Sequence, residues 1–297
     1  MFVNAVKWAS LFTYPVIVSK RLEAGKVECG CASFVILNSD GWVLTAAHVL
    51  NDLSLFNNQK KEQAEQDSIK ASIQADASLN EKQKKRKIGH IPRISNRILN
   101  ISYWWGADNV LGGEAVVNGF LDLAVTKLTG LPQLPANKYP VFMNAPAGSA
   151  DFPQGLSVCR LGFPFHEINA AFDEATSRFT LAPGALPVPR FPNDGILTRR
   201  VILVDPASNR TAEFIETSTP GLRGQSGGPV FDVHGYIWGI QSRTINLPLG
   251  FSPTVKQNSK DVVEHQFLNV GLALHSAEVT KFLQENNIAF NISPVAN

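Results

Sequence analysis

The residues best suited to covalent chemistry lie in segment 224–229, which reads Gly-Gln-Ser-Gly-Gly-Pro. A serine between glycines suits a nucleophile, because the backbone can turn sharply, the hydroxyl is exposed and successive N–H groups can point at one spot. Taken alone, the same pattern could be a glycine-rich turn without function. Ser226 is therefore a candidate nucleophile that requires a base and an acid elsewhere in the chain.

The same segment also satisfies Gly-x-Ser-x-Gly, the nucleophile elbow of α/β-hydrolases. That elbow needs a helix directly after the serine, whereas two glycines and a proline followed by a β-patterned hairpin forbid one. Its order of catalytic residues would also require an acid such as Asp261 with His265 or His275. Strands and helices do not alternate around the motif, so we reject this interpretation.

A candidate base and acid occur earlier in the chain. His48 ends a strong strand pattern, after Ala46 and Ala47, which are small enough for tight packing where the histidine leaves the sheet. Asp122 lies in Leu-Asp-Leu-Ala-Val at 121–125, where a lone carboxylate is costly unless it is paired. An imidazole N–H is a suitable partner and would fix the tautomer that a general base needs.

Together, Thr-Ala-Ala-His at 45–48, the Asp122 segment and segment 224–229 resemble the trypsin-like serine proteases, in that family's order His, Asp, Ser. Within the family, the chain is most similar to the bacterial HtrA-type and glutamyl endopeptidase-type branches. Further similarity lies in segments 161–165, 195–199, 239–242 and 270–274. The resemblance covers nearly the whole chain except residues 51–100.

The resemblance implies a role for each matching residue. Ser226 attacks the peptide carbonyl, His48 takes its proton, and Asp122 orients His48 and stabilises its charged form. The backbone N–H groups of Gly224 and Ser226 form the oxyanion hole.

It also implies a substrate pocket at Pro220, Gln241, Ser242 and Arg243. Pro220 occupies the position that matches the base of the trypsin pocket. Because this residue is not an acid, cleavage after Arg or Lys is not expected. Gln241 matches a wall position that is polar in glutamyl endopeptidases, and we expect a small, apolar or uncharged polar P1 residue. Ser242 matches the position that hydrogen-bonds the triad aspartate, or is an ordinary strand serine. Arg223 and Arg243 would favour acidic substrate residues, or are ordinary surface arginines.

One departure from the family concerns activation. In zymogen-type members an Asp before the nucleophile pairs with a newly cleaved N-terminus, whereas Gln225 occupies that position here. No activation site of the Arg-Ile-Val-Gly-Gly kind occurs, so activation by propeptide cleavage is not expected. The loop 219–225 is then either preordered or ordered by a partner. We also expect no HtrA-type peptide-binding module after the protease.

Many short strand patterns separated by glycine and proline predict an all-β barrel or sandwich, and the resemblance implies two six-stranded antiparallel β-barrels, as in chymotrypsin. The first lobe covers residues 1–135, with a helical insertion at about 51–100, and the second covers 136–297 with a C-terminal helix at 276–286. Turn signals predict hairpins at 34–45 and 230–240. Residues 58–87 predict a long helix or a helical hairpin broken near Asn80. We expect loops at 132–155 (the linker between lobes), 163–194 and 247–265, the last polar and unpatterned.

The composition of the chain excludes several classes of protein. The chain of 297 residues has 44% hydrophobic residues and a net charge of +2, which predicts neither a nucleic-acid coat nor a membrane surface. Residues 1–20 lack the features of a signal peptide, so they are expected to contribute strands. Three cysteines (Cys29, Cys31 and Cys159) form no disulfide framework, which indicates a reducing compartment and a cytoplasmic protein. The resemblance implies a bacterial source. We expect no cofactor and no metal.

Expected partners are a protein or peptide substrate and a regulatory protein docking on the helical insertion. The basic run at 82–87 is interpreted as a solvated helix end in preference to a nucleic-acid contact. His90, His166, His234, His265 and His275 are expected in loops or at the surface, and Trp104 and Trp105 in the core.

The predicted function is a serine endopeptidase. A non-catalytic interaction module on a protease fold is the alternative, disfavoured because the triad is complete, and an esterase is a third option.

Overall fold

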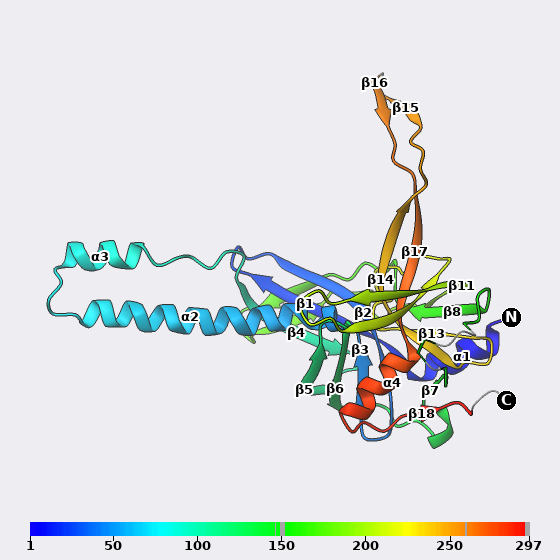
Figure 1. Cartoon of the computed structure of the whole chain (residues 1–297). Coiled ribbons are helices and arrows are strands. Elements are labelled where there is room, and N and C mark those ends of the chain that lie inside the picture. Colours follow the sequence, from blue (N-terminus) through cyan, green and yellow to red (C-terminus); the bar gives the residue numbers. More distant parts are fainter. Residues whose placement is uncertain (146, 149–151, 259, 295–297) are drawn as a thin grey trace.

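The computed structural model describes residues 1–145, 147–148, 152–258 and 260–294. Its body contains two mainly antiparallel sheets, and two arms project from it in different directions, one helical and one a β-hairpin (Figure 1). The mostly-β architecture with a helical insertion and a C-terminal helix confirms the predicted fold class.

The first sheet has six strands in the order β4-β1-β2-β3-β6-β5. Their bounds are β1 Thr13–Leu22, β2 Val27–Ile36, β3 Trp42–Thr45, β4 Ile98–Trp105, β5 Leu111–Asn118 and β6 Leu123–Thr129. β2 and β3 form the predicted hairpin, in which the Asn38 side chain accepts a hydrogen bond from the Asp40 N–H. Gly41 follows with a φ of +84°, a conformation that glycine adopts without strain.

The second sheet has eight strands, of which six close into a ring because β13 pairs with both β8 and β14. The ring consists of β8 Ser157–Gly162, β11 Phe191–Val204, β12 Thr211–Thr217, β13 Pro229–Phe231, β14 Ile237–Pro248 and β17 Phe267–His275. Two short strands extend this sheet: β7 Val141–Phe142 pairs in parallel with β14, and β18 Asn291–Ile292 pairs in parallel with β7. The predicted hairpin at 230–240 is confirmed as β13–β14. The expected loop at 163–194 instead contains a small hairpin, β9 Ala170–Asp173 with β10 Arg178–Leu181.

The helical arm consists of α2 Asn51–Ala75 and α3 Glu81–Gly89, which confirms a helical hairpin. Asn80 begins α3 with a capping box, in which its side chain accepts from the Gln83 N–H and the Gln83 side chain accepts from the Asn80 N–H. In α2 only Gln59 is buried, and its side-chain oxygen accepts a hydrogen bond from the Ile98 N–H in β4. The arm therefore meets the body only near its base.

The second arm corrects the sequence-based prediction of a polar, unpatterned loop at 247–265. β14 and β17 pair far beyond the body, to Pro248 opposite Phe267, and a small hairpin of β15 Thr254–Gln257 and β16 Lys260–Val263 follows. Large apolar side chains are exposed along it: Leu249, Phe251, Val262, Val263, Phe267 and Leu268. Because both faces of this hairpin meet solvent, it lacks the alternation of apolar and polar residues from which strands are recognised.

The N-terminal segment supplies β1, as expected, but only after the helix α1 Val3–Phe12, which was not predicted. α1 buries Ala5, Ala9 and Phe12 and contacts β8 of the second sheet. The predicted terminal helix is confirmed as α4 Ser276–Glu285. The predicted linker at 132–155 includes the short 3-10 helix η2 Ala136–Lys138 and β7, while residues 146 and 149–151 lie outside the described residues.

Candidate active site

Ser226 lies in the loop between β12 and β13, and glycines at two positions allow the chain to form it. Gly224 has a φ of +98°, and a β-carbon there would lie 2.3 Å from the carbonyl oxygen of Phe163. Gly227 has a φ of +82°, and a β-carbon there would lie 2.3 Å from the carbonyl oxygen of Ser33. Both positions combine a left-handed backbone with a close approach to another segment, so only glycine fits them without strain.

Backbone hydrogen bonds hold this loop against β2 and β8. The Ser226 carbonyl accepts from the Ser33 N–H at 2.8 Å, and the Gly224 carbonyl accepts from both the Phe163 N–H and the Ser33 hydroxyl. Gln225 is fully buried, and its side-chain oxygen accepts from the Leu222 N–H at 2.9 Å. Within the described residues, the N–H groups of Gly224 and Ser226 donate to no protein atom. Two backbone donors next to the serine therefore remain available to a ligand.

His48 follows β3 in a short 3-10 helix, η1 Ala47–Leu50. Ala46 and Ala47 are buried, as their size suggested, while the His48 side chain is 41% exposed. Thr45 anchors the strand end, because its hydroxyl donates to the Ser33 carbonyl at 2.7 Å. The imidazole thus extends from a fixed strand end into solvent-accessible space.

Asp122 lies in the turn before β6 with a left-handed φ of +55° and is only 8% exposed. Its carboxylate lies 2.9 and 3.0 Å from Nδ1 of His48, and it accepts the His48 backbone N–H at 3.0 Å. The Ser242 hydroxyl donates to Oδ2 of this carboxylate at 2.5 Å. Burial alone would raise the pKa of Asp122, but the hydrogen bonds from His48 and Ser242 outweigh it and hold that pKa below its ordinary value.

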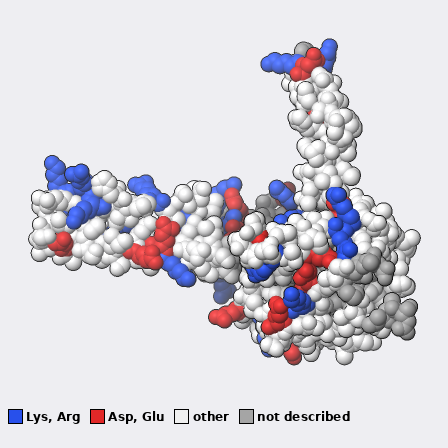
Figure 2. Space-filling view, in the orientation of Figure 1, with Lys and Arg blue, Asp and Glu red and all other residues white. Residues whose placement is uncertain are grey.

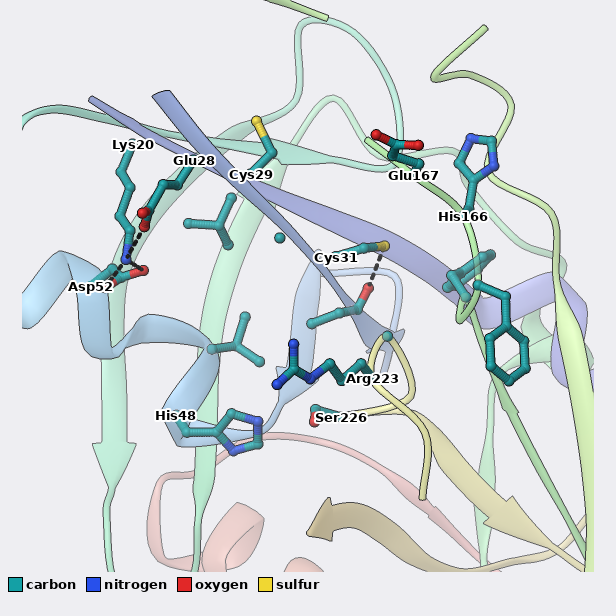
Figure 3. A pocket seen from close by; sticks show the side chains of 17 residues that line it. Lys20, Glu28, Cys29, Cys31, His48, Asp52, His166, Glu167, Arg223 and Ser226 are labelled. Atoms are coloured by element: carbon teal, nitrogen blue, oxygen red, sulfur yellow. Dashed lines mark hydrogen bonds and ion pairs between the residues drawn. The ribbon is translucent and has the colours of Figure 1, made fainter. Parts of the chain in front are cut away.

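His48 and Ser226 line one pocket of about 680 Å³, which Figure 3 shows from close by. In that view the Arg223 side chain is drawn above both His48 and Ser226. The imidazole and the serine hydroxyl do not share a hydrogen bond in this structure. The structure therefore brings the three predicted residues together at this site, with the hydrogen bond between His48 and Asp122 formed and Ser226 lining the same pocket as His48.

The four residues expected to form the substrate pocket do not all line the same pocket. Ser242 and Arg243 line a second pocket of about 490 Å³, which His48 and Asp122 also line. Gln241 is buried, donates to the Arg243 carbonyl at 2.9 Å and leaves its side-chain oxygen without a hydrogen-bond partner. Its side chain packs against Gly221, and neither it nor Pro220 lines either of these two pockets.

Sequence analysis missed two residues that support the site. Ser33 bonds the nucleophile loop through both backbone and side chain, and no sequence signal identifies it. Arg160 is buried in β8, where its guanidinium donates to the Pro220 carbonyl at 2.8 Å and to the Thr217 hydroxyl. Burial lowers its pKa to about 10. A charged residue inside the apolar strand pattern of β8 was the signal that could have identified it.

His275 was expected at the surface, and that prediction was wrong. It is buried at the end of β17, where its Nδ1 accepts the Ala277 N–H and caps α4. Burial lowers its pKa. The expectation for tryptophans is confirmed for Trp105, which is buried, whereas Trp104 is half-buried and donates to Asp108.

No group of three or more His, Cys, Asp or Glu side chains in the described part of the chain is arranged to hold a metal ion. Among the helices described, none is both long enough and apolar enough to cross a membrane.

Comparison with known proteins gave one family match and several structural similarities. No curated protein matches the sequence. The active form of Rv3671c protease from M. tuberculosis is similar at 15% identity and a TM-score of 0.49, covering 98% of this chain and 88% of that one. An inactive form of Rv3671c protease is similar at 16% identity and a TM-score of 0.42, covering 91% and 87%. A family model described as a trypsin-like peptidase domain matches residues 32–240, the range that includes His48, Asp122 and Ser226. The chain therefore belongs to the trypsin-like peptidase family and is a hydrolase of the serine endopeptidase type.

Proposed function

We propose that this serine endopeptidase cleaves protein substrates through Ser226, His48 and Asp122. Ser226 Oγ attacks the peptide carbonyl while His48 takes the hydroxyl proton, and the acyl-enzyme forms when His48 returns that proton to the leaving amine. Water then attacks the ester in the same way and releases Ser226. The observation that carries the proposal is the hydrogen-bonded Asp122–His48 pair facing the pocket that Ser226 also lines.

The oxyanion hole consists, in this proposal, of the N–H groups of Gly224 and Ser226. Both belong to a loop held by backbone hydrogen bonds, and neither donates elsewhere in the described residues. Fixed donors of this kind stabilise the negative charge of the tetrahedral intermediate without having to reorient during the reaction.

Propeptide cleavage is not part of the proposed activation. The buried Gln225 side chain ties position 225 to Leu222 within the same loop, a contact that requires no newly formed N-terminus. This supports the preordered alternative for loop 219–225. Ordering by a partner remains the other alternative, and the exposed helical arm offers a surface for one.

We propose a two-lobe division at residues 1–135 and 136–297. The first sheet lies wholly in the first range and the closed ring wholly in the second. His48 and Asp122 then come from one lobe, and Ser226 and Ser242 from the other. Substrate would bind along the boundary between them.

The helical arm is proposed as the docking site for a regulatory protein. It projects well clear of the body, and basic side chains gather at its end (Figure 2). Four of these cations form no ion pair within the described residues: Lys82, Lys85, Arg86 and Lys87. Such a surface suits a partner with an acidic face.

A cytoplasmic location in a bacterium stays a proposal. It is supported by the three free thiols, two of which, on Cys31 and Cys159, have pKa values raised by burial to about 12 and about 11. Fractionation of cells that express the tagged chain tests it, and recovery outside the cytoplasm would contradict it.

The proposed catalytic serine is tested with a fluorophosphonate probe. We expect stoichiometric labelling of the wild-type protein, located at Ser226 by peptide mapping, and no labelling or peptide cleavage by Ser226→Ala. Ser252→Ala is the matched control, because Ser252 also lies against a histidine, His265, at 3.1 Å, but on the exposed hairpin arm. Labelling that persists in Ser226→Ala would refute the assignment. Parallel assays on peptides and simple esters distinguish an endopeptidase from an esterase.

A further inference from the structure

Arg223 is a cation close in sequence to the proposed nucleophile, Ser226. It is exposed, and it lines the same pocket as His48 and Ser226. In Figure 3 its side chain extends over Ser226, and the guanidinium ends on the side of His48. Within the described residues it forms no hydrogen bond and no ion pair.

The carboxylates that line this pocket are already engaged. Asp52 binds Lys20 at 3.0 Å, and Glu28 binds Lys26 at 2.8 Å and Lys20 at 3.6 Å. These contacts, with the Lys26 hydrogen bond the largest, lower the pKa of Glu28 and keep it ionised. They lie on one side of the view in Figure 3, away from Arg223. Among the described residues, no acid therefore neutralises Arg223, and a ligand carboxylate could.

The remaining acid of the pocket, Glu167, does not change this conclusion. It lies with His166 at the far end of the view in Figure 3 and accepts a hydrogen bond from the Asn169 side chain at 3.0 Å. An arginine over the nucleophile can form two parallel hydrogen bonds with a carboxylate, which a lysine cannot.

The position of Arg223 also indicates which part of a substrate it would meet. The residues expected to receive the segment before the scissile bond do not line this pocket: Pro220, Gln241, Ser242 and Arg243. The pocket extends instead from Ser226 along β2, past Cys31 and Cys29. Given the proposed function, this is the side on which the leaving peptide lies.

We propose that Arg223 is a specificity-determining residue that binds an acidic side chain just after the scissile bond, at P1′ or P2′. The inference rests on the proposed function, because it needs Ser226 as the nucleophile. The substrate class is then a polypeptide with Asp or Glu directly following the cleaved bond. Because the guanidinium is exposed, we expect about a five- to tenfold preference for Glu over Gln, decreasing as salt rises.

The test uses a peptide library to find cleaved sequences, followed by matched quenched peptides with Glu, Gln or Lys at P1′ and P2′. Wild type should cleave the Glu peptide fastest at one of these positions. Arg223→Gln should lose the preference, Arg223→Lys should keep part of it, and Arg223→Glu should prefer the Lys peptide. Lys127→Gln is the control, because Lys127 is an exposed cation of β6 that does not line the pocket of Ser226, and its removal should leave the ratio of Glu to Gln unchanged.

The same peptides are also tested as protectors of Ser226 against fluorophosphonate labelling, so the result does not depend on turnover. If wild type cleaved the Glu and Gln peptides equally fast, and both peptides protected Ser226 equally well, the inference would be overturned. Labelling of Ser226 in that experiment would still leave the proposed function intact. If Arg223→Gln cleaved all the peptides more slowly by the same factor, the Arg223 charge would be acting on the reacting centre and not on an acidic side chain of the substrate. That result would also overturn the inference. Absence of both labelling and cleavage would remove the proposed function and this inference together.

Discussion

The two halves of the candidate site are fixed by different kinds of contact. Asp122 and His48 are joined through side chains, with the carboxylate held between the imidazole and the Ser242 hydroxyl. The loop of Ser226 is instead fixed through its backbone, by hydrogen bonds to Ser33 and by two glycines that admit no side chain. Substitutions in the first half should therefore change charge while the fold stays in place, and substitutions in the second half should move the backbone itself.

The largest expected effect tests the first half through Asp122→Asn. The backbone at this position is left-handed, which asparagine tolerates, so the fold should remain. The amide cannot stabilise a charged imidazole and would hold the wrong tautomer, so kcat should fall by about 10⁴. Peptide-hydrolysis kinetics and thermal melting of the same preparation measure the two effects.

A large drop in melting temperature for Asp122→Asn would mean that the carboxylate maintains the fold as much as the chemistry. Activity close to wild type would remove Asp122 from the mechanism. Either outcome would break the distinction between the two halves.

Gly224→Ala tests the second half and should cost about 10² to 10³ in kcat, the typical loss of one oxyanion donor. A β-carbon at 2.3 Å from the Phe163 carbonyl must displace the loop and with it the N–H of residue 224. Gly25→Ala is the matched control, because Gly25 has a similar φ of +81° but open space around it. An unchanged kcat in Gly224→Ala, or an equal loss in Gly25→Ala, would contradict the assigned role of the loop backbone.

Ser242→Ala tests the hydrogen bond that joins the two halves, and its expected cost is about tenfold in kcat, the value of one hydrogen bond to a charged group. The same substitution should also change how stability depends on pH. In the folded protein the pKa of Asp122 is lowered, so the contribution of its carboxylate to stability is present above about pH 3.8 and is lost as the pH falls through the folded pKa. Removal of the Ser242 donor raises that folded pKa, so acid unfolding should begin at a higher pH. An acid-denaturation midpoint equal to wild type would show that Ser242 does not stabilise the carboxylate.

Much of the fold could be predicted because the signals are local. Turn residues identify the hairpins β2–β3 and β13–β14, and low apolar content with strong helix formers identifies the arm of α2 and α3. The extended hairpin of β14 and β17 was missed because solvent on both faces removes the alternating pattern. His275 was placed wrongly because its burial depends on the packing of β17 and α4, which no short window of sequence reveals.

The residues of the candidate site likewise include some that local sequence predicts and some that it does not. Short motifs were enough to nominate Ser226, His48 and Asp122, because each chemical role demands a characteristic local sequence. The contacts of Ser33 were not predictable, since they join residues 191 positions apart and use a backbone that any residue supplies. The free charge of Arg223 could be recognised only once the neighbouring acids were seen to be paired elsewhere.

The smallest expected effect concerns the helical arm, whose contacts with the body are confined to its base. Gln59 and Gln63 bind Ile98 and Arg97, and these contacts would survive replacement of residues 64–92 by a short glycine–serine turn. Because the removed part buries almost nothing, kcat/KM on small peptides and the melting temperature should change by less than about twofold and about 2 °C, respectively. If the arm docks a regulator, the truncated protein should lose regulation in cell extract while its basal activity is unchanged. A truncated protein that is inactive on small peptides would show instead that the arm orders the site directly.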